Sequence, residues 1–294
     1  MNWLLIASDD EKSTLVKESL NKLFPESIIY QSGVEKKEVR SLYEILGEIT
    51  GLILISDEIS SGCELIVGYL CGNKVPVLTN ASIDKEVLNC FETLKCVKDV
   101  DAILSYLKKN KKKISREVQK REALNYLFEK GIPYSPDHFS KYIEKGNLEI
   151  CECYLAAGMD VNSRDKDGTP MLNIAVRNDN AQLVEWLLKN GAELNPVSED
   201  RGYTPLMDAV WRKNEEITKL LIDKGADVNV INKEGQTMII LSVGSENLEI
   251  TRLLCEAGAD VDIQDQMGMS AYGYASLFKK QKILEILEKY HKED

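Results

Sequence analysis

The feature that most constrains this chain is a segment of 33 or 34 residues that recurs through its C-terminal half. The best-formed copy is GYTPLMDAVWRKNEEITKLLIDKGADVN, at residues 202–229. Successive copies end in glycine at Gly158, Gly191, Gly225 and Gly258, at intervals of 33, 34 and 33 residues. A chain with such a period folds as a stack of similar units, because no single unit can bury its own apolar face.

Each copy has the pattern of a tight turn followed by two antiparallel helices. The apolar residues of the second helix recur at helical spacing, at Leu183 and Leu187, Ile217 and Leu221, and Ile250 and Leu254. The terminal glycines suit a left-handed cap that ends this helix. Full units start near residues 168, 202 and 235, and helical segments on either side predict caps at both ends. The sequence predicts an all-α solenoid of about five helix pairs over residues 123–294.

The repeat resembles the ankyrin family. Its copies begin DGTPMLNIAV, RGYTPLMDAV, EGQTMIILSV and MGMSAYGYAS, and they end NGAELN, KGADVN and AGADVD. A period of about 33 residues with TPL near the unit start is the signature of that family. The resemblance implies a histidine after TPL that ties neighbouring turns, but Asn173, Met207, Ile240 and Gly273 stand there. We therefore expect a somewhat weaker stack.

The same resemblance implies a binding surface for another protein on the concave face of the stack. That face consists of the turn tips and the outward positions of the first helices. The residues expected on it are Arg177, Tyr203, Asp208, Trp211, Arg212, Met269 and Tyr274. Trp, Tyr and Arg most often carry binding energy in protein interfaces. An alternative for Trp211 is that its side chain packs on the neighbouring helix.

Residues 1–109 alternate between apolar strand-like segments and amphipathic helices. The segments WLLIAS, SIIYQS, GLILIS, VPVLTN and KCV predict strands, and helices are expected near 9–24, 35–49, 61–71 and 100–110. This alternation predicts a Rossmann-like α/β domain with an open, mostly parallel sheet. Ligands of such sheets bind at the carboxyl ends of the strands. The candidate ligand-binding residues there are Asp9, Asp57, Ser60, Ser61 and Gly62.

The segment ITGLILISDEISSGCELIVGYLCGNKVPVLTNAS, residues 49–82, resembles the core of the nucleoside 2-deoxyribosyltransferase-like proteins. The resemblance implies a nucleoside or nucleotide ligand and a catalytic glutamate two residues before the Gly-Tyr pair. Ile66 stands at that position, so we expect a domain that is non-catalytic or senses a ligand. The alternative is an enzyme that cleaves or transfers at the N-glycosidic bond, with Glu64 as the catalytic nucleophile.

A second resemblance is to the receiver domains of two-component systems. It implies metal binding by Asp9 and Asp10, phosphorylation of Asp57 and a switch hydroxyl at Thr79. The segment from Asp57 to Pro76 is about six residues shorter than that family requires, and no Lys-Pro pair follows the last strand. This reading stays open as a further alternative.

A basic segment joins the two predicted domains. Residues 108–122 hold eight Lys and Arg against two Glu, in a chain whose net charge is −11. We interpret residues 110–122 as a basic helical linker, because the segment lacks interleaved aromatic residues and any nucleic-acid-binding motif. The overall acidity also argues against a nucleic-acid partner, because like charges repel.

Composition further limits the chemistry of the chain. It has two histidines, and its seven cysteines form no C-x-x-C pair, so we expect no metal site and no cofactor. No segment approaches the roughly 18 apolar residues of a membrane helix. The N-terminus lacks the basic region of a signal peptide. These features predict a cytoplasmic protein without a membrane partner.

Overall fold

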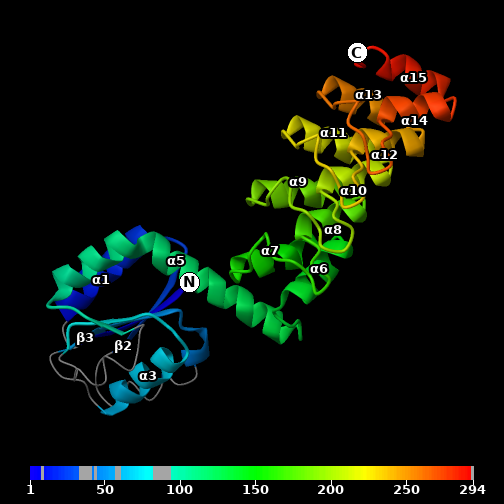
Figure 1. Cartoon of the computed structure of the whole chain (residues 1–294). Helices are drawn as coiled ribbons and strands as arrows, with labels where there is room; N and C mark the ends of the chain where they lie inside the picture. Colours follow the sequence, from blue (N-terminus) through cyan, green and yellow to red (C-terminus); the bar gives the residue numbers. More distant parts are fainter. Residues whose placement is uncertain (8–9, 33–41, 43–44, 57–60, 82–93, 293–294) are drawn as a thin grey trace. The chain divides into compact units, whose positions relative to one another are not determined.

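The computed structural model describes residues 1–7, 10–32, 42, 45–56, 61–81 and 94–292 of the chain. It divides into two compact units, Met1–Glu122 and Ala123–Asp294 (Figure 1). Within the described residues, no helix is both long and apolar enough to cross a membrane.

The first unit contains a parallel sheet of five strands. Its strands are β1 (Asn2–Ala7), β2 (Ile28–Ser32), β3 (Gly51–Ile55), β4 (Val77–Thr79) and β5 (Leu94–Cys96). Their order in the sheet is β2-β1-β3-β4-β5, and each neighbouring pair is parallel. All five strands that the apolar segments predicted are confirmed.

Helices pack on both faces of this sheet, as Figure 1 shows. Side chains alternate between the two faces of a strand. Trp3 and Leu5 pack with α1 (Asp10–Leu23) and α5 (Val100–Glu129). Leu4 and Ile6 pack with α3 (Ser61–Gly72). The helix expected near 35–49 lies largely outside the described residues, which contain the 3-10 helix η2 (Leu46–Glu48) at its end.

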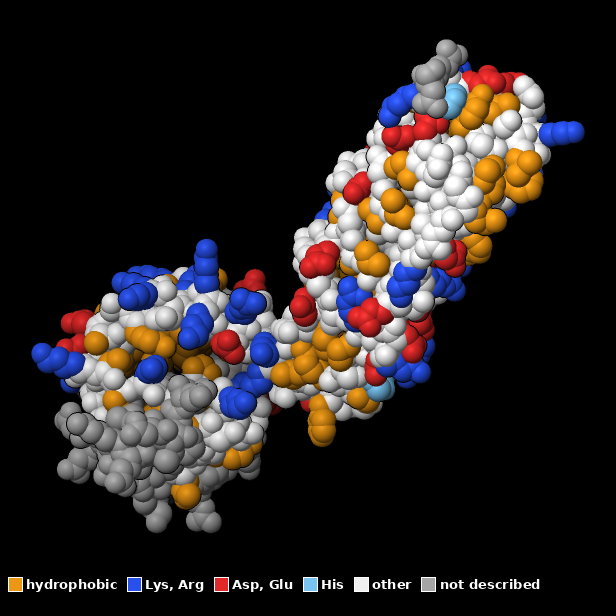
Figure 2. Space-filling model, viewed as in Figure 1, with side chains coloured by type: hydrophobic (Ala, Val, Ile, Leu, Met, Phe, Trp, Pro, Cys, Tyr) orange, Lys and Arg blue, Asp and Glu red, His pale blue; other side chains and the backbone are white. Residues whose placement is uncertain are grey.

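The basic segment belongs to one long helix. α5 extends from Val100 to Glu129 without a break, because neither glycine nor proline occurs in it. Ile103, Leu107 and Ile114 pack in a core of the first unit. Leu127, near the end of the same helix, packs in the core of the second. The sequence correctly predicted helix for residues 110–122 but divided α5 into three segments. Figure 2 shows Lys and Arg side chains exposed along α5.

The second unit is a row of five antiparallel helix pairs (Figure 1). The pairs are α6 (Pro136–Glu144) with α7 (Leu148–Ala156), α8 (Met171–Arg177) with α9 (Ala181–Lys189), α10 (Pro205–Trp211) with α11 (Glu215–Asp223), α12 (Met238–Ser245) with α13 (Leu248–Glu256), and α14 (Ala271–Leu277) with α15 (Gln281–Leu287). The first helices of neighbouring pairs contact each other in the order α6, α8, α10, α12, α14. One continuous apolar core therefore extends through the stack, as predicted.

Local capping explains why the pairs repeat so regularly. An asparagine caps the second helix of four pairs by accepting the backbone N–H three residues later, at Asn147, Asn180, Asn214 and Asn247. The glycine after the second helix has a positive φ, between 88° and 94°, at Gly158, Gly191, Gly225 and Gly258. The left-handed caps that the repeat glycines predicted are therefore confirmed.

Candidate functional site

A groove of about 650 Å³ crosses the first helices of three successive pairs. Its aromatic lining comes from two places. Tyr203 precedes α10 and Trp211 ends it, and Tyr274 lies on α14 with Phe278 directly after it. The floor between them is α12, which contributes the apolar Ile240, Leu241 and Val243 together with Gly244. Figure 2 shows hydrophobic side chains exposed over α14.

Three of the seven residues expected on the concave face line this groove, namely Tyr203, Trp211 and Tyr274. The Trp211 side chain is 56% exposed, so it does not pack into the core. Its ring meets Tyr203 edge to face, with the ring centroids 6.4 Å apart. Tyr203 is buried behind it, with 8% of its surface exposed. Trp211 is therefore the more accessible of these two rings.

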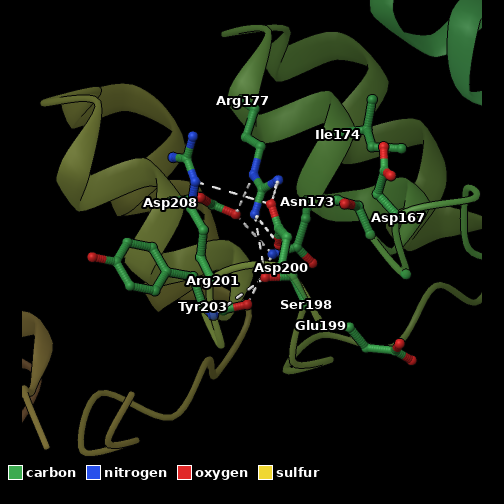
Figure 3. A network of polar contacts seen from close by, with 12 residues as sticks. Asp167, Asn173, Ile174, Arg177, Ser198, Glu199, Asp200, Arg201, Tyr203 and Asp208 are labelled. Atoms are coloured by element: carbon green, nitrogen blue, oxygen red, sulfur yellow. Dashed lines mark hydrogen bonds and ion pairs between the residues drawn. The ribbon is translucent and has the colours of Figure 1, made fainter. Parts of the chain in front are cut away.

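The expectation that Asp208 lies on the surface is wrong. Asp208 is on the first turn of α10 and only 1% of it is exposed. Its Oδ2 accepts hydrogen bonds from Arg177 Nε at 2.9 Å and from Asn173 Nδ2 at 2.8 Å, both on α8 (Figure 3). The carboxylate thus faces the preceding pair and not the groove.

Asn173 stands where the family resemblance placed a histidine, and it makes a comparable bond between turns. Its Nδ2 also donates to the backbone carbonyl of Tyr203 at 3.1 Å. At the equivalent positions of the next two pairs, Met207 and Ile240 are buried apolar side chains; neither can donate a hydrogen bond, and the Met207 thioether is only a weak acceptor. The polar tie between turns is therefore preserved at the interface between α8 and α10. The expectation of a weaker stack stays a prediction, which rests on the next two interfaces.

Arg177, the second expected surface residue of this region, connects two carboxylates. Its guanidinium binds Asp200 with two bonds, Nη1 to Oδ2 at 2.7 Å and Nη2 to Oδ1 at 3.1 Å, as well as Asp208. Burial raises the pKa of Asp208 even though Arg177 opposes the shift. Hydrogen bonds from Arg177 lower the pKa of the more exposed Asp200. With 18% of its side chain exposed, Arg177 acts mainly within the stack.

The two remaining expected residues, Arg212 and Met269, lie outside the groove lining. Arg212 Nε donates to Asp179 Oδ2 at 2.9 Å, and its side chain is 41% exposed. Met269 is half-buried in the turn before α14, where its N–H donates to Asp265 Oδ1 at 3.1 Å. Arg212 thus links neighbouring pairs, and Met269 shapes a turn.

The ligand-binding candidates of the first unit fall largely outside the described part of the chain. Asp9, Asp57 and Ser60 lie outside it, as do the side chains of Ser61 and Glu64 and the surroundings of Gly62. Ile66 is described, and it is fully buried in the core beneath the sheet. Thr79 is also buried, and its hydroxyl accepts the N–H of Ala81 at 3.0 Å.

The cysteines of the repeats show the features of structural thiols. Burial raises the pKa of the Cys151 thiol to about 12 and that of Cys255 to about 11, so both stay protonated and unreactive near neutral pH. In the described part of the chain, no group of three or more His, Cys, Asp and Glu is placed to hold a metal ion.

Several residues that line the groove were missed in the sequence, namely Lys213, Glu234, Ile240, Leu241, Val243, Gly244 and Phe278. A signal for Gly244 was present. Each first helix of the last four pairs contains a small residue at the same place, Ala175, Ala209, Ser242 or Ala275. Two positions later, the four copies carry Arg177, Trp211, Gly244 and Leu277. Comparing the copies position by position would have shown that one copy lacks a side chain where the others have a long one.

Comparison with known proteins supports the assignment of the second unit. A family model for ankyrin repeats (three copies) matches residues 139–232 and 213–294. An ankyrin repeat-containing protein of Treponema pallidum (strain Nichols) is 32% identical over 212 residues, which covers 72% of this chain and 71% of that relative. These 212 residues outnumber the 172 of the second unit, so the match extends at least 40 residues into the first.

Other similar proteins match over shorter segments. The human 2-5A-dependent ribonuclease is 43% identical over 68 residues, 23% of this chain and 9% of the ribonuclease. The ankyrin repeat and SAM domain-containing protein 6 of Rattus norvegicus is 36% identical over 77 residues, 26% of this chain and 9% of that protein. The helix-pair architecture, the family match and the Treponema relative lead to one conclusion: the chain belongs to the ankyrin-repeat family.

Proposed function

We propose that this chain is a protein-interaction module that binds a partner protein in the groove lined by Tyr203, Trp211, Tyr274 and Phe278. The observation that carries the proposal is the 56% exposure of Trp211 on the groove wall. Exposed aromatic surface is costly in water, and tryptophan is enriched among the residues that dominate binding energy. A partner that covers Trp211 gains the free energy of burying it.

Trp211→Ala is expected to weaken binding of the partner by about 2 kcal/mol, or roughly 30-fold in the dissociation constant. Partners are recovered from cells that express the chain and identified by quantitative mass spectrometry. The purified partner is then titrated against each variant by isothermal calorimetry. Phe128→Ala is the matched control, because Phe128 is an aromatic side chain that is 86% exposed on the last turn of α5 and does not line the groove. Equal affinity of the Trp211→Ala and Phe128→Ala variants would refute the groove as the binding site.

For the first unit we propose a role without catalysis. The support is Ile66, which stands where the deoxyribosyltransferase-like family has its nucleophile and is fully buried among apolar side chains. The unmodified chain, incubated with a panel of nucleosides and nucleotides, is expected to release no free base by chromatography. Release of base that disappears in Glu64→Gln would instead establish the enzyme alternative.

A further inference from the structure

One position of α12 lacks a side chain where the other first helices carry a long one. The equivalent residues of the four copies are Arg177, Trp211, Gly244 and Leu277. Gly244 is exposed on the groove floor, and a Cβ added to it would meet no atom within 4 Å. Glycine is unfavourable in a helix, and no neighbouring atom requires it here. The result is an open notch between the copies on either side.

Two exposed aromatic rings flank the notch. Trp211 is 56% and Phe278 is 58% exposed, and each lies against a second ring. Tyr203 meets Trp211 edge to face, and Tyr274 stacks on Phe278 with centroids 5.9 Å apart and the ring planes 2° from parallel. The Tyr274 hydroxyl donates to Asp265 Oδ2 at 2.6 Å, which fixes this pair. The notch thus has apolar walls that are held in place, as a pocket for a large apolar side chain requires.

The rim of the groove carries a cation that lacks an ion pair. Lys213 follows α10, is exposed and lines the groove. The equivalent residues in the copies before and after it are both acidic and both paired with a cation, Asp179 with Arg212 and Glu246 with Lys280. Among the described residues no carboxylate forms an ion pair with the Lys213 ammonium group, and Glu246, whose pKa is lowered by Lys280 and to a lesser degree by the charge of Lys213, is paired with Lys280. Its charge is therefore available to an anionic group in the groove.

The opposite end of the groove has the opposite charge. Glu234 lines the groove and is exposed in the turn that precedes α12. Because α10 and α12 are neighbouring first helices of the stack, Lys213 after one and Glu234 before the other lie at opposite ends. Charges arranged in this way orient a bound segment and select its direction.

Resting on the proposed function, we infer that the groove takes a partner peptide segment that places one large apolar side chain in the notch at Gly244 and a carboxylate beside Lys213. The aliphatic and aromatic lining selects the apolar side chain. Lys213 attracts an Asp or Glu of the partner that lies within about two residues of the apolar one, since successive residues of an extended chain lie about 3.3 Å apart. The partner motif is therefore a large apolar residue next to an acidic one.

A phage-displayed library of random 12-residue peptides, selected on the full chain, tests this inference. The selected peptides are expected to share Phe, Trp, Leu or Met within two residues of Asp or Glu. Synthetic copies, measured by fluorescence anisotropy, should bind Gly244→Leu at least about tenfold more weakly, and Gly244→Ala should show a smaller loss because it fills less of the notch. Both variants should melt no lower than the unmodified chain, since alanine and leucine favour helix over glycine.

Charge reversal provides a second, independent readout. Selection on Lys213→Glu is expected to recover peptides with Lys or Arg in place of the acid. Lys219→Glu, a reversal on α11 outside the groove lining, should leave the acidic preference unchanged. A selection without the apolar and acidic pair, or one whose peptides bind Gly244→Leu at full affinity, overturns the inference. If those peptides still lose affinity with Trp211→Ala, the proposed function stands while the inference fails; if they do not, both fail.

Discussion

Replacing Arg177 with methionine is expected to lower the free energy of unfolding of the repeats by about 3 kcal/mol. The substitution removes the cation that balances Asp208, whose side chain is 1% exposed. Removing one partner of a buried ion pair costs about 3–5 kcal/mol, because the other charge stays buried without compensation. We expect the lower end of this range, since Asn173 Nδ2 still donates to the carboxylate at 2.8 Å.

Chemical denaturation followed by circular dichroism measures this loss. Arg252→Met is the matched control, because Arg252 forms an ion pair with Glu249 in which both side chains are about half exposed, and such pairs contribute little. Adding Asp208→Asn to Arg177→Met should recover much of the stability, because the amide carries no charge and still accepts from Asn173. Equal losses in Arg177→Met and Arg252→Met would contradict a stabilising role of the network in Figure 3.

The cost of Arg177→Met is also expected to shrink as the pH falls from 7 to 4. Burial already raises the pKa of Asp208 above its usual 3.8, and loss of Arg177 raises it further. The variant therefore regains stability when Asp208 is protonated. Asp200, whose pKa is lowered in the unmodified chain, contributes stability that is lost only below its ordinary value of 3.8, so this contribution stays nearly constant between pH 7 and 4. The titration of Asp208 therefore reduces the difference in this range, and a difference independent of pH would exclude that effect.

The elements that the sequence predicted well are those whose signal is local. A strand such as Gly51–Ile55 is buried along its whole length, so it appears as an uninterrupted apolar run. The repeat units carry their own start, period and stop signals within about 33 residues. α5 was harder, because apolar residues of one helix such as Ile114 and Leu127 pack in different units, and only the three-dimensional partners reveal that the helix is continuous.

The candidate site depended on contacts that the sequence does not contain. Asp208 and Trp211 lie three residues apart on α10, yet the first is 1% and the second 56% exposed. A seven-residue helix offers too few positions to assign its faces from periodicity alone. Asp208 faces the interior because it accepts a hydrogen bond from Arg177, 31 residues earlier in the chain. The groove was predictable from Tyr203, Trp211 and Tyr274. Its notch was not, because it depends on the side chain that Gly244 lacks.

In the first unit, Gly51→Ala is expected to lower the free energy of unfolding by about 3 kcal/mol. Gly51 on β3 is the register partner of Trp3 on β1. A Cβ added at Gly51 would lie 2.5 Å from Cζ3 and 2.7 Å from Cε3 of that indole, far inside contact distance. Trp3 is 1% exposed and packs on Phe24, with ring centroids 5.4 Å apart. The ring has no room to move, so the cost falls near the upper end of the 1–3 kcal/mol typical of overpacking.

Hydrogen exchange followed by mass spectrometry can assign this loss to the first unit. The amides of β1 and β3 should exchange faster in Gly51→Ala, and those of the repeats should be unchanged, because the two units have separate cores. Gly68→Ala in α3 is the matched control, since a Cβ there meets no atom within 4 Å. Trp3→Leu makes space for the new methyl group, so combining it with Gly51→Ala should cost at least about 1 kcal/mol less than the two single losses added together. Additive losses would show that the indole is not what requires glycine at this position.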